Sequence, residues 1–237
     1  MKPLLDNIDL FLFISATVVT ILGFFVYTWI VSPGFTKRIL RIEMGKPRQL
    51  YVQRFAGALI FGVLPMLIIL LSGSTSYVEF GIKVPVSATY LWTMVLSLLI
   101  IPMNYFNAPK PTNLEAYPQI REEYWTVNLL IQSAISWIIY LTAYEFLFRG
   151  FLFFTSISIL GLWPAILFNT VIYSLVHYPK GYKEMLGAIP LGIILCYLTY
   201  LTGSIWVAVF THIILALSNE WFSLYHHPNM VLKKSHR

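Results

Sequence analysis

Long apolar runs repeat along this sequence and limit what the chain can fold into. Several reach the roughly 20 residues that an α-helix needs to cross the hydrocarbon core of a bilayer. Only 11% of the 237 residues are charged, whereas soluble domains carry about 25%. The sequence therefore predicts an all-α, polytopic protein that is integral to a lipid bilayer. The predicted spans cover residues 10–31, 55–71, 89–106, 125–160, 163–177, 185–201 and 204–225.

The fourth run leaves the number of spans open. Residues 125–160 would form a helix about 54 Å long at 1.5 Å per residue, whereas the hydrocarbon core is roughly 30 Å thick. The run is either one long, tilted helix or two segments broken near Thr142. One helix gives seven spans and two give eight. Seven is preferred, because it places the basic tail on the same side as the other basic loops.

Basic residues gather in the loops rather than in the spans. Residues 35–54 contain six Lys and Arg against one acidic residue, Glu43, and further Lys and Arg lie at 180–183 and in the tail. The positive-inside rule predicts that these segments, and the C-terminus with them, are cytoplasmic. The net charge of +6 therefore reflects membrane topology and does not indicate a nucleic-acid partner.

A loop with three prolines and mixed charges, residues 107–123, suggests a division of the chain. We predict an N-terminal three-span region with the basic loop over residues 1–123. A core that carries the chemistry follows over 124–225, and a basic tail over 226–237.

Glu145 and Arg149 lie four residues apart inside the fourth apolar run. At this spacing they share a helical face and can form an ion pair. Asn128, Thr142 and Ser156 fall on the same face. Lipid cannot satisfy a polar stripe, so Glu145 is predicted to point inward. An ionisable residue at membrane depth is a candidate functional site, and a purely structural ion pair is the alternative.

Two histidines lie in later apolar runs. His177 comes near the predicted cytoplasmic end of its span, where an interfacial histidine is the simpler interpretation. His212 lies in the segment 207–217, which is apolar apart from Thr211, and a buried imidazole there needs a hydrogen-bond partner. Seven residues later, Asn219 returns to nearly the same helical face.

Together these residues permit two kinds of chemistry. Glu145 and His177 could deprotonate a water while His212 and Asn219 donate to a developing oxyanion. The same carboxylate and two imidazoles could instead bind one zinc ion and leave a position open for water. The residue pattern does not separate these alternatives.

The order of these residues resembles the CPBP family, the CAAX-protease and bacteriocin-processing (Abi) intramembrane proteins. That family's pattern is Glu-Glu-x-x-x-Arg, then Phe-x-x-x-His, then His-x-x-x-Asn. Arg149, His177 and His212 match it, and Glu145 matches the second glutamate. The resemblance covers roughly residues 142–220. It implies an intramembrane protease fold with a membrane-anchored peptide or protein substrate.

Three positions depart from the family pattern. Tyr144 stands where the family's first, water-activating glutamate is expected, so Glu145 would have to serve as the base. Tyr173 replaces the phenylalanine. Ala216 replaces the asparagine, and only helical phase offers Asn219 as its substitute.

Three functions are consistent with this pattern. The first is an intramembrane endopeptidase that uses Glu145, His177, His212 and Asn219, with Arg149 positioning Glu145. The second is a catalytically inactive member of the family that acts as a scaffold, immunity or binding protein. The third is a small carrier with a proton relay, which is disfavoured because no inverted pair of broken spans is visible.

Overall fold

The computed structural model describes residues 7–73 and 77–233 and is helical almost throughout. The N-terminal region contains α1 (Asn7–Val31), α2 (Pro33–Arg38), α3 (Pro47–Ala58), η1 (Leu59–Val63), α4 (Leu64–Leu71), η2 (Tyr77–Phe80), α5 (Ser87–Asn107) and α6 (Pro111–Leu114). The remainder contains β1 (Tyr124–Trp125), α7 (Val127–Glu145), η3 (Phe146–Leu152), α8 (Phe153–Leu160), α9 (Leu162–Leu175), η4 (Tyr178–Lys180), α10 (Tyr182–Thr202), α11 (Trp206–His226) and β2 (Val231–Leu232).

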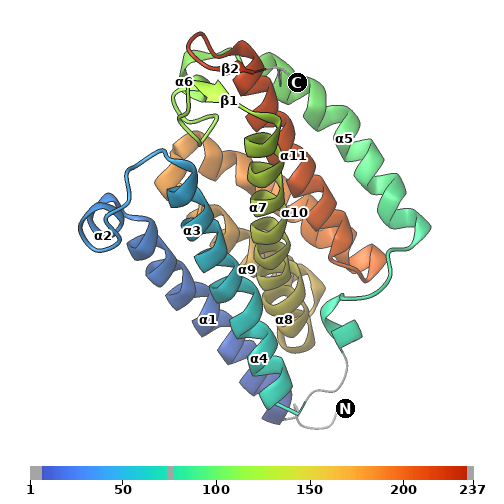
Figure 1. Cartoon of the computed structure of the whole chain (residues 1–237). Coiled ribbons are helices and arrows are strands. Elements are labelled where there is room, and N and C mark those ends of the chain that lie inside the picture. The colour runs from blue at the N-terminus through green and yellow to red at the C-terminus, as the bar shows by residue number, and fades with distance from the viewer. Residues whose placement is uncertain (1–6, 74–76, 234–237) are drawn as a thin grey trace.

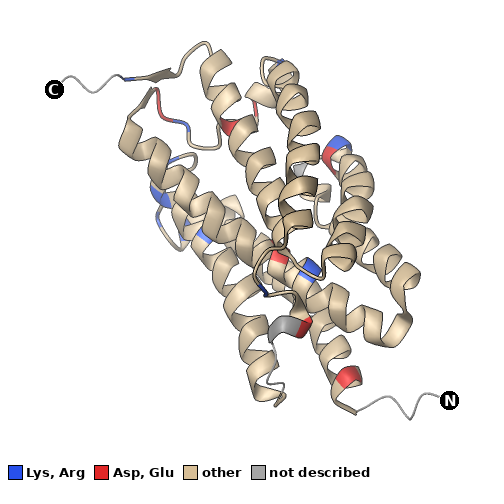
Figure 2. Cartoon of the chain, turned by 90° about the vertical axis from the view of Figure 1, so that its right-hand side faces the viewer, with Lys and Arg blue, Asp and Glu red and all other residues tan. Residues whose placement is uncertain are grey.

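The helices lean together in a bundle with its two chain ends at opposite ends (Figure 1). At its centre, α7 contacts α3 and α11, while α11 also packs along α5, and α9 packs along α10. The outer helical surface carries few charged residues (Figure 2), and large apolar side chains are exposed on it, Leu98 and Trp163 among them. An apolar outer surface of this kind suits lipid, so the prediction of an all-α polytopic membrane protein is confirmed.

Within the described part of the chain, six helices are long and apolar enough to cross a membrane: Asn7–Val31, Pro47–Leu71, Ser87–Asn107, Val127–Leu160, Tyr182–Thr202 and Trp206–His226. The predicted fifth span, 163–177, corresponds to α9 and is about as short as the sequence indicated. Helix α9 has 14 residues, or roughly 21 Å of helix, which is less than the hydrocarbon core. It begins directly after Gly161, whose φ of 79° turns the chain back from α8, and it ends before Pro179.

The long fourth run is one helix without a break at Thr142. Its middle section, η3, is π-helical and begins directly after Glu145. Turns of this kind are rare and occur frequently at functional sites. The predicted polar stripe is shorter than expected: Glu145, Arg149 and Ser156 are fully buried, whereas Asn128, in the first turn of α7, is exposed.

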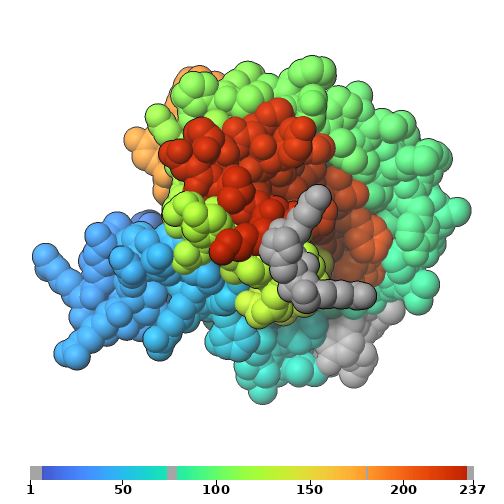
Figure 3. Space-filling view, turned by 45° about the horizontal axis from the view of Figure 1, so that its top comes forward, coloured from blue at the N-terminus to red at the C-terminus, as the bar shows by residue number. Residues whose placement is uncertain are grey.

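The basic loop, the proline-containing loop and the tail lie at one end of the bundle. The Arg121 amide donates to the Gly45 carbonyl, and Tyr124 pairs with Val231 in a parallel β1–β2 ladder. Seen from this end, the C-terminal segment covers the middle of the face and the first helices lie to one side (Figure 3). The predicted division into 1–123, 124–225 and 226–237 stays a prediction.

Candidate functional site

Glu145 is the centre of a buried charged cluster. Its side chain is fully buried at the end of α7. The Nδ1 of His212 donates to Glu145 Oε1 at 2.6 Å, and the Nη1 of Arg149 lies 3.2 Å from Glu145 Oε2. The inward orientation of Glu145 and its pairing with Arg149 agree with the sequence expectation. Both carboxylate oxygens are therefore already engaged by protein groups.

Arg149 and the π-helical turn are held by side chains of α9. The guanidinium of Arg149 lies over the Tyr173 ring, 4.0 Å from its centroid, which is a favourable place for a desolvated cation. Asn169 Nδ2 donates to the Phe148 carbonyl at 2.7 Å, and its Oδ1 accepts from the Cys196 thiol at 3.2 Å. These contacts fix η3, and with it the position of the guanidinium.

His177 lies just beyond the end of α9, and its ring is oriented by the backbone. Its Nδ1 donates to the Tyr173 carbonyl at 2.7 Å. In a neutral imidazole this leaves the lone pair on Nε2. The predicted action of Glu145 and His177 on one water therefore stays a prediction.

Tyr144 lies against both histidines. Its ring makes edge contacts with both, with centroid distances of 5.5 Å to His212 and 6.3 Å to His177. The residue is buried at the position where the family pattern has its first glutamate. A phenol ring thus stands where a carboxylate was expected to face water.

Asn219 lies two turns further along α11 than His212. Seven residues of helix rise about 10 Å. This axial separation is too large for both side chains to contact one oxygen atom directly. Within residues 7–73 and 77–233, Asn219 Oδ1 has no hydrogen-bond partner. Its oxyanion role therefore stays a prediction.

The donors do not assemble into a metal site. Among the described residues there is no group of three His, Cys, Asp or Glu side chains that could hold a metal ion. Glu145 Oε1 and His212 Nδ1 are hydrogen-bonded to each other, so neither atom is directed at a common ion. Zinc binding by Glu145, His177 and His212 therefore stays a prediction.

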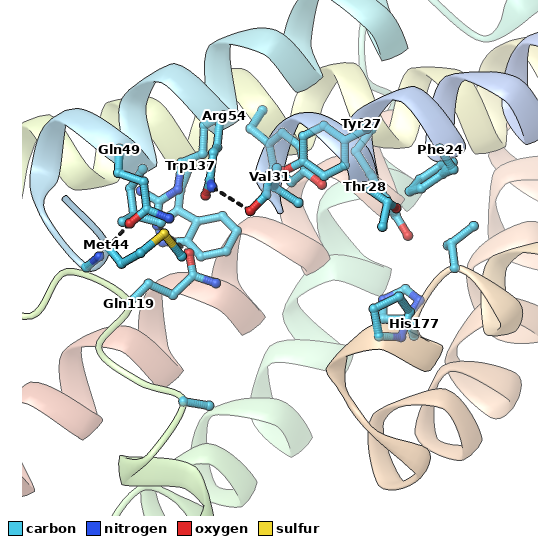
Figure 4. A pocket seen from close by; sticks show the side chains of 18 of the residues that line it. Phe24, Tyr27, Thr28, Val31, Met44, Gln49, Arg54, Gln119, Trp137 and His177 are labelled. Atoms are coloured by element: carbon cyan, nitrogen blue, oxygen red, sulfur yellow. Dashed lines mark hydrogen bonds between the residues drawn. The ribbon is translucent and has the colours of Figure 1, made fainter. Parts of the chain in front are cut away.

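A cavity of about 520 Å³ connects this region to the basic end of the bundle. Its walls come from α1, α3, α7 and the turn after α9. Tyr144 and His177 lie along its lining, as do Arg54, Gln119 and Arg121. Figure 4 shows His177 at one end, near Phe24 and Thr28, and Arg54 with Gln119 at the other. Its volume is that of a small-molecule or short-peptide site.

Residues 126–218 match the family model described as type II CAAX prenyl endopeptidase Rce1-like. This part of the chain is an Rce1-like domain. It belongs to the CPBP, or CAAX protease, family, which confirms the resemblance seen in the sequence. No curated protein and no solved structure matches the chain.

The Rce1-like domain contains four of the five predicted site residues. Glu145, Arg149, His177 and His212 fall inside the matched range, and Asn219 lies one residue beyond it. Asn169 was not among the predicted site residues, although a lone carboxamide in an apolar helix is a usable signal. Arg54 was not among them either; it lies outside the matched range and contributes to the cavity wall.

Proposed function

We propose that this protein is an intramembrane endopeptidase that hydrolyses a peptide bond of a membrane-associated substrate. Membership of the Rce1-like family supports a protease-type function, and the CAAX protease family acts on membrane-associated, prenylated substrates. The observation that carries the proposal is His177. Its Nδ1 is committed to the Tyr173 carbonyl, and the residue lines the cavity.

In this mechanism, His177 is the general base. Its Nε2 takes a proton from a water in the cavity, and the resulting hydroxide adds to the substrate carbonyl carbon. The tetrahedral intermediate then collapses, and the leaving amine receives the proton from His177. A neutral imidazole is well suited to both transfers, because its unperturbed pKa is about 6.5.

Glu145 and Arg149 act through His212 as positioning residues. A carboxylate that accepts from Nδ1 orients the imidazole and favours its protonated form, as in Ser–His–Asp triads. Protonated His212 can then donate from Nε2 to the developing oxyanion. The sequence suggested Glu145 as the base, whereas here the base is His177. The Glu145 carboxylate is fully buried, and its two oxygens contact His212 and Arg149.

We further propose that the end of the bundle with the basic loop and the C-terminus faces the cytoplasm. Residues 35–54 carry the highest density of Lys and Arg, and positive charge near span ends favours that side. Cysteine labelling from the two sides of a vesicle, at residue 40 and at residue 84, tests the orientation. Labelling of residue 40 from the extracytoplasmic side would overturn it.

The proposed function is tested with purified protein in liposomes and a library of membrane-anchored peptides, with and without a prenyl group. Mass spectrometry identifies any cleaved bond. The wild type is expected to cleave, and His177→Ala is expected to lower the rate by about 10²–10⁴-fold, the usual contribution of a general base. His227→Ala, at a half-buried histidine outside the cavity lining, is the matched control. Cleavage that persists in His177→Ala would assign the base to another residue.

A specific observation favours a second candidate, a family member that binds a membrane-associated peptide without cleaving it. Tyr144 fills the position of the expected first glutamate, against His177 and His212. If the wild type binds but does not cleave any library peptide, this second function holds. Cleavage that appears only in Tyr144→Glu would show that this one phenol keeps the site inactive.

A further inference from the structure

Arg54 is a buried cation on the cavity wall, at the end away from His177. It is 3% exposed and comes from α3, outside the Rce1-like domain. Its Nη1 donates to Ser133 O, Ser133 Oγ and Ser136 Oγ at 3.2, 3.3 and 2.7 Å. Its Nη2 donates to Gln119 Oε1 at 3.0 Å, and its guanidinium lies 3.9 Å from the Trp137 ring centroid.

The hydrogen bonds of this guanidinium are incomplete. Within the described residues, Arg54 Nε has no hydrogen-bond partner, and Arg54 forms no ion pair within 4.0 Å. Glu220 is joined to it only indirectly, through Ser133 Oγ and the Gln119 amide. A carboxylate could accept from Nε and from the second hydrogen of Nη2, which is the planar two-point geometry that arginine favours.

The charge of the cavity lining suits an anion. Two arginines, Arg54 and Arg121, line the cavity, and no Asp or Glu does so among the residues that the structure describes. Arg121 Nη1 and Nη2 donate to the carbonyls of Leu114 and Glu115, which hold this second cation at the cavity lining. Arginine commonly recognises a carboxylate through two parallel hydrogen bonds.

The rest of the lining suits a peptide better than a fatty acid. Aromatic side chains, Tyr27 and Tyr140 among them, can cover apolar side chains. The carboxamides of Gln49, Gln53 and Gln119 also line the cavity, and a carboxamide pairs with the N–H and C=O groups of a peptide backbone. An acyl chain offers these amides no partner.

We propose that Arg54, supported by Arg121, binds the C-terminal carboxylate of an apolar peptide that extends through the cavity toward His177. One part of this proposal rests on the proposed function, namely that a peptide bond upstream of the C-terminus lies next to His177. It assigns recognition of the free terminus to a residue outside the Rce1-like domain. The binding itself requires no hydrolysis.

The test is equilibrium binding of two fluorescent apolar peptides to the detergent-purified full chain. The peptides have one sequence and end in a free carboxylate or in a neutral amide. The wild type is expected to bind the acid about tenfold or more tightly than the amide, the effect of a charge-assisted hydrogen bond. Mass spectrometry after each titration shows whether the peptide has been cleaved. Failure of the proposed peptidase activity is therefore distinguished from failure of carboxylate binding.

Variants assign the preference to Arg54. Arg54→Gln is expected to bind acid and amide equally, whereas Arg48→Gln, which changes an exposed arginine of the same helix, keeps the wild-type ratio. Arg121→Gln should lower the acid-to-amide affinity ratio without abolishing the preference. If Arg54→Gln fails to fold, Arg121→Gln takes its place in the test. Equal binding of acid and amide by the folded wild type overturns the proposal. Displacement of the peptide by decanoate at the same concentration would reassign the occupant to a fatty acid.

Discussion

Two buried charged clusters in this protein are built differently. In the cluster within the Rce1-like domain, Glu145 contacts His212 and Arg149 directly, at 2.6 and 3.2 Å. In the cluster between α3 and the domain, Arg54 and Glu220 are linked only through neutral groups, Ser133 and Gln119. We call the first cluster closed because its charges pair directly, which can position a histidine, although Nε, Nη1 and Nη2 of Arg149 have no hydrogen-bond partner among the described residues. In the second cluster the cation has no ion pair within 4.0 Å among the described residues. It lies on a cavity wall, where it can receive a ligand.

Removing the arginine of each cluster should separate the two most clearly. Arg149→Leu leaves the Glu145 carboxylate buried and without its ion-pair partner, so the free energy of unfolding should fall by about 3–5 kcal/mol. Arg54→Leu leaves mainly hydroxyl and carboxamide groups unpaired, and should cost about 1–3 kcal/mol. Unfolding in mixed micelles measures both values. A larger loss for Arg54→Leu would contradict this distinction between the clusters.

Glu145→Gln tests whether the closed cluster positions His212 for catalysis. The carboxamide keeps the shape but no longer favours a protonated imidazole, so kcat should fall by about 10²–10⁴-fold with little change in KM. Steady-state rates over a range of substrate concentrations measure kcat and KM separately, and an unchanged kcat would leave Glu145 with a structural role only.

Gly57→Ala tests the contact between α3 and α7 that places Arg54 at the cavity. A Cβ at this position would lie 2.4 Å from Tyr140 Cε2 and 3.1 Å from Tyr27 Cε2. We expect a loss of about 1–3 kcal/mol from overpacking and weaker binding of the acid peptide. Gly187→Ala, with open space around it, is the control. Wild-type binding by Gly57→Ala would show that α3 can shift without moving Arg54.

An exposed ion pair at the same end of the bundle gives the smallest effect. Lys46 Nζ lies 3.2 Å from Glu122 Oε1, and both side chains are partly exposed. Lys46→Ala should change the free energy of unfolding by less than about 1 kcal/mol and leave the acid-to-amide ratio unchanged. A loss as large as that of Arg149→Leu would show that burial does not decide the strength of these pairs.

Part of this architecture could be predicted because the membrane restricts where charge can lie. The spacing of Glu145 and Arg149 and the apolar surroundings of His212 indicate an inward cluster, and the structure brings these three residues together. No comparable sequence signal marks the π-helical turn, because apolar residues continue through it. The short length of α9 was predictable, because His177 and Pro179 follow closely after Leu175.

The second cluster could not be predicted from local patterns. Arg54 stands at the start of an apolar run and, in sequence, looks like one more basic residue of a cytoplasmic loop. Its partners Ser133 and Ser136 lie about 80 positions away, and only the packing of α3 on α7 brings them together. Tyr144 is a related case, because the sequence shows the departure from the family pattern but not that the ring lies against both histidines.

The short helix α9 also has a consequence for the surrounding bilayer. Its roughly 21 Å leave about 9 Å of a typical hydrocarbon core uncovered. Lipids beside α9 must therefore compress, or water must enter to the depth of His177. Turnover should accordingly depend on acyl-chain length, and liposomes of shorter-chain lipids should support the faster reaction.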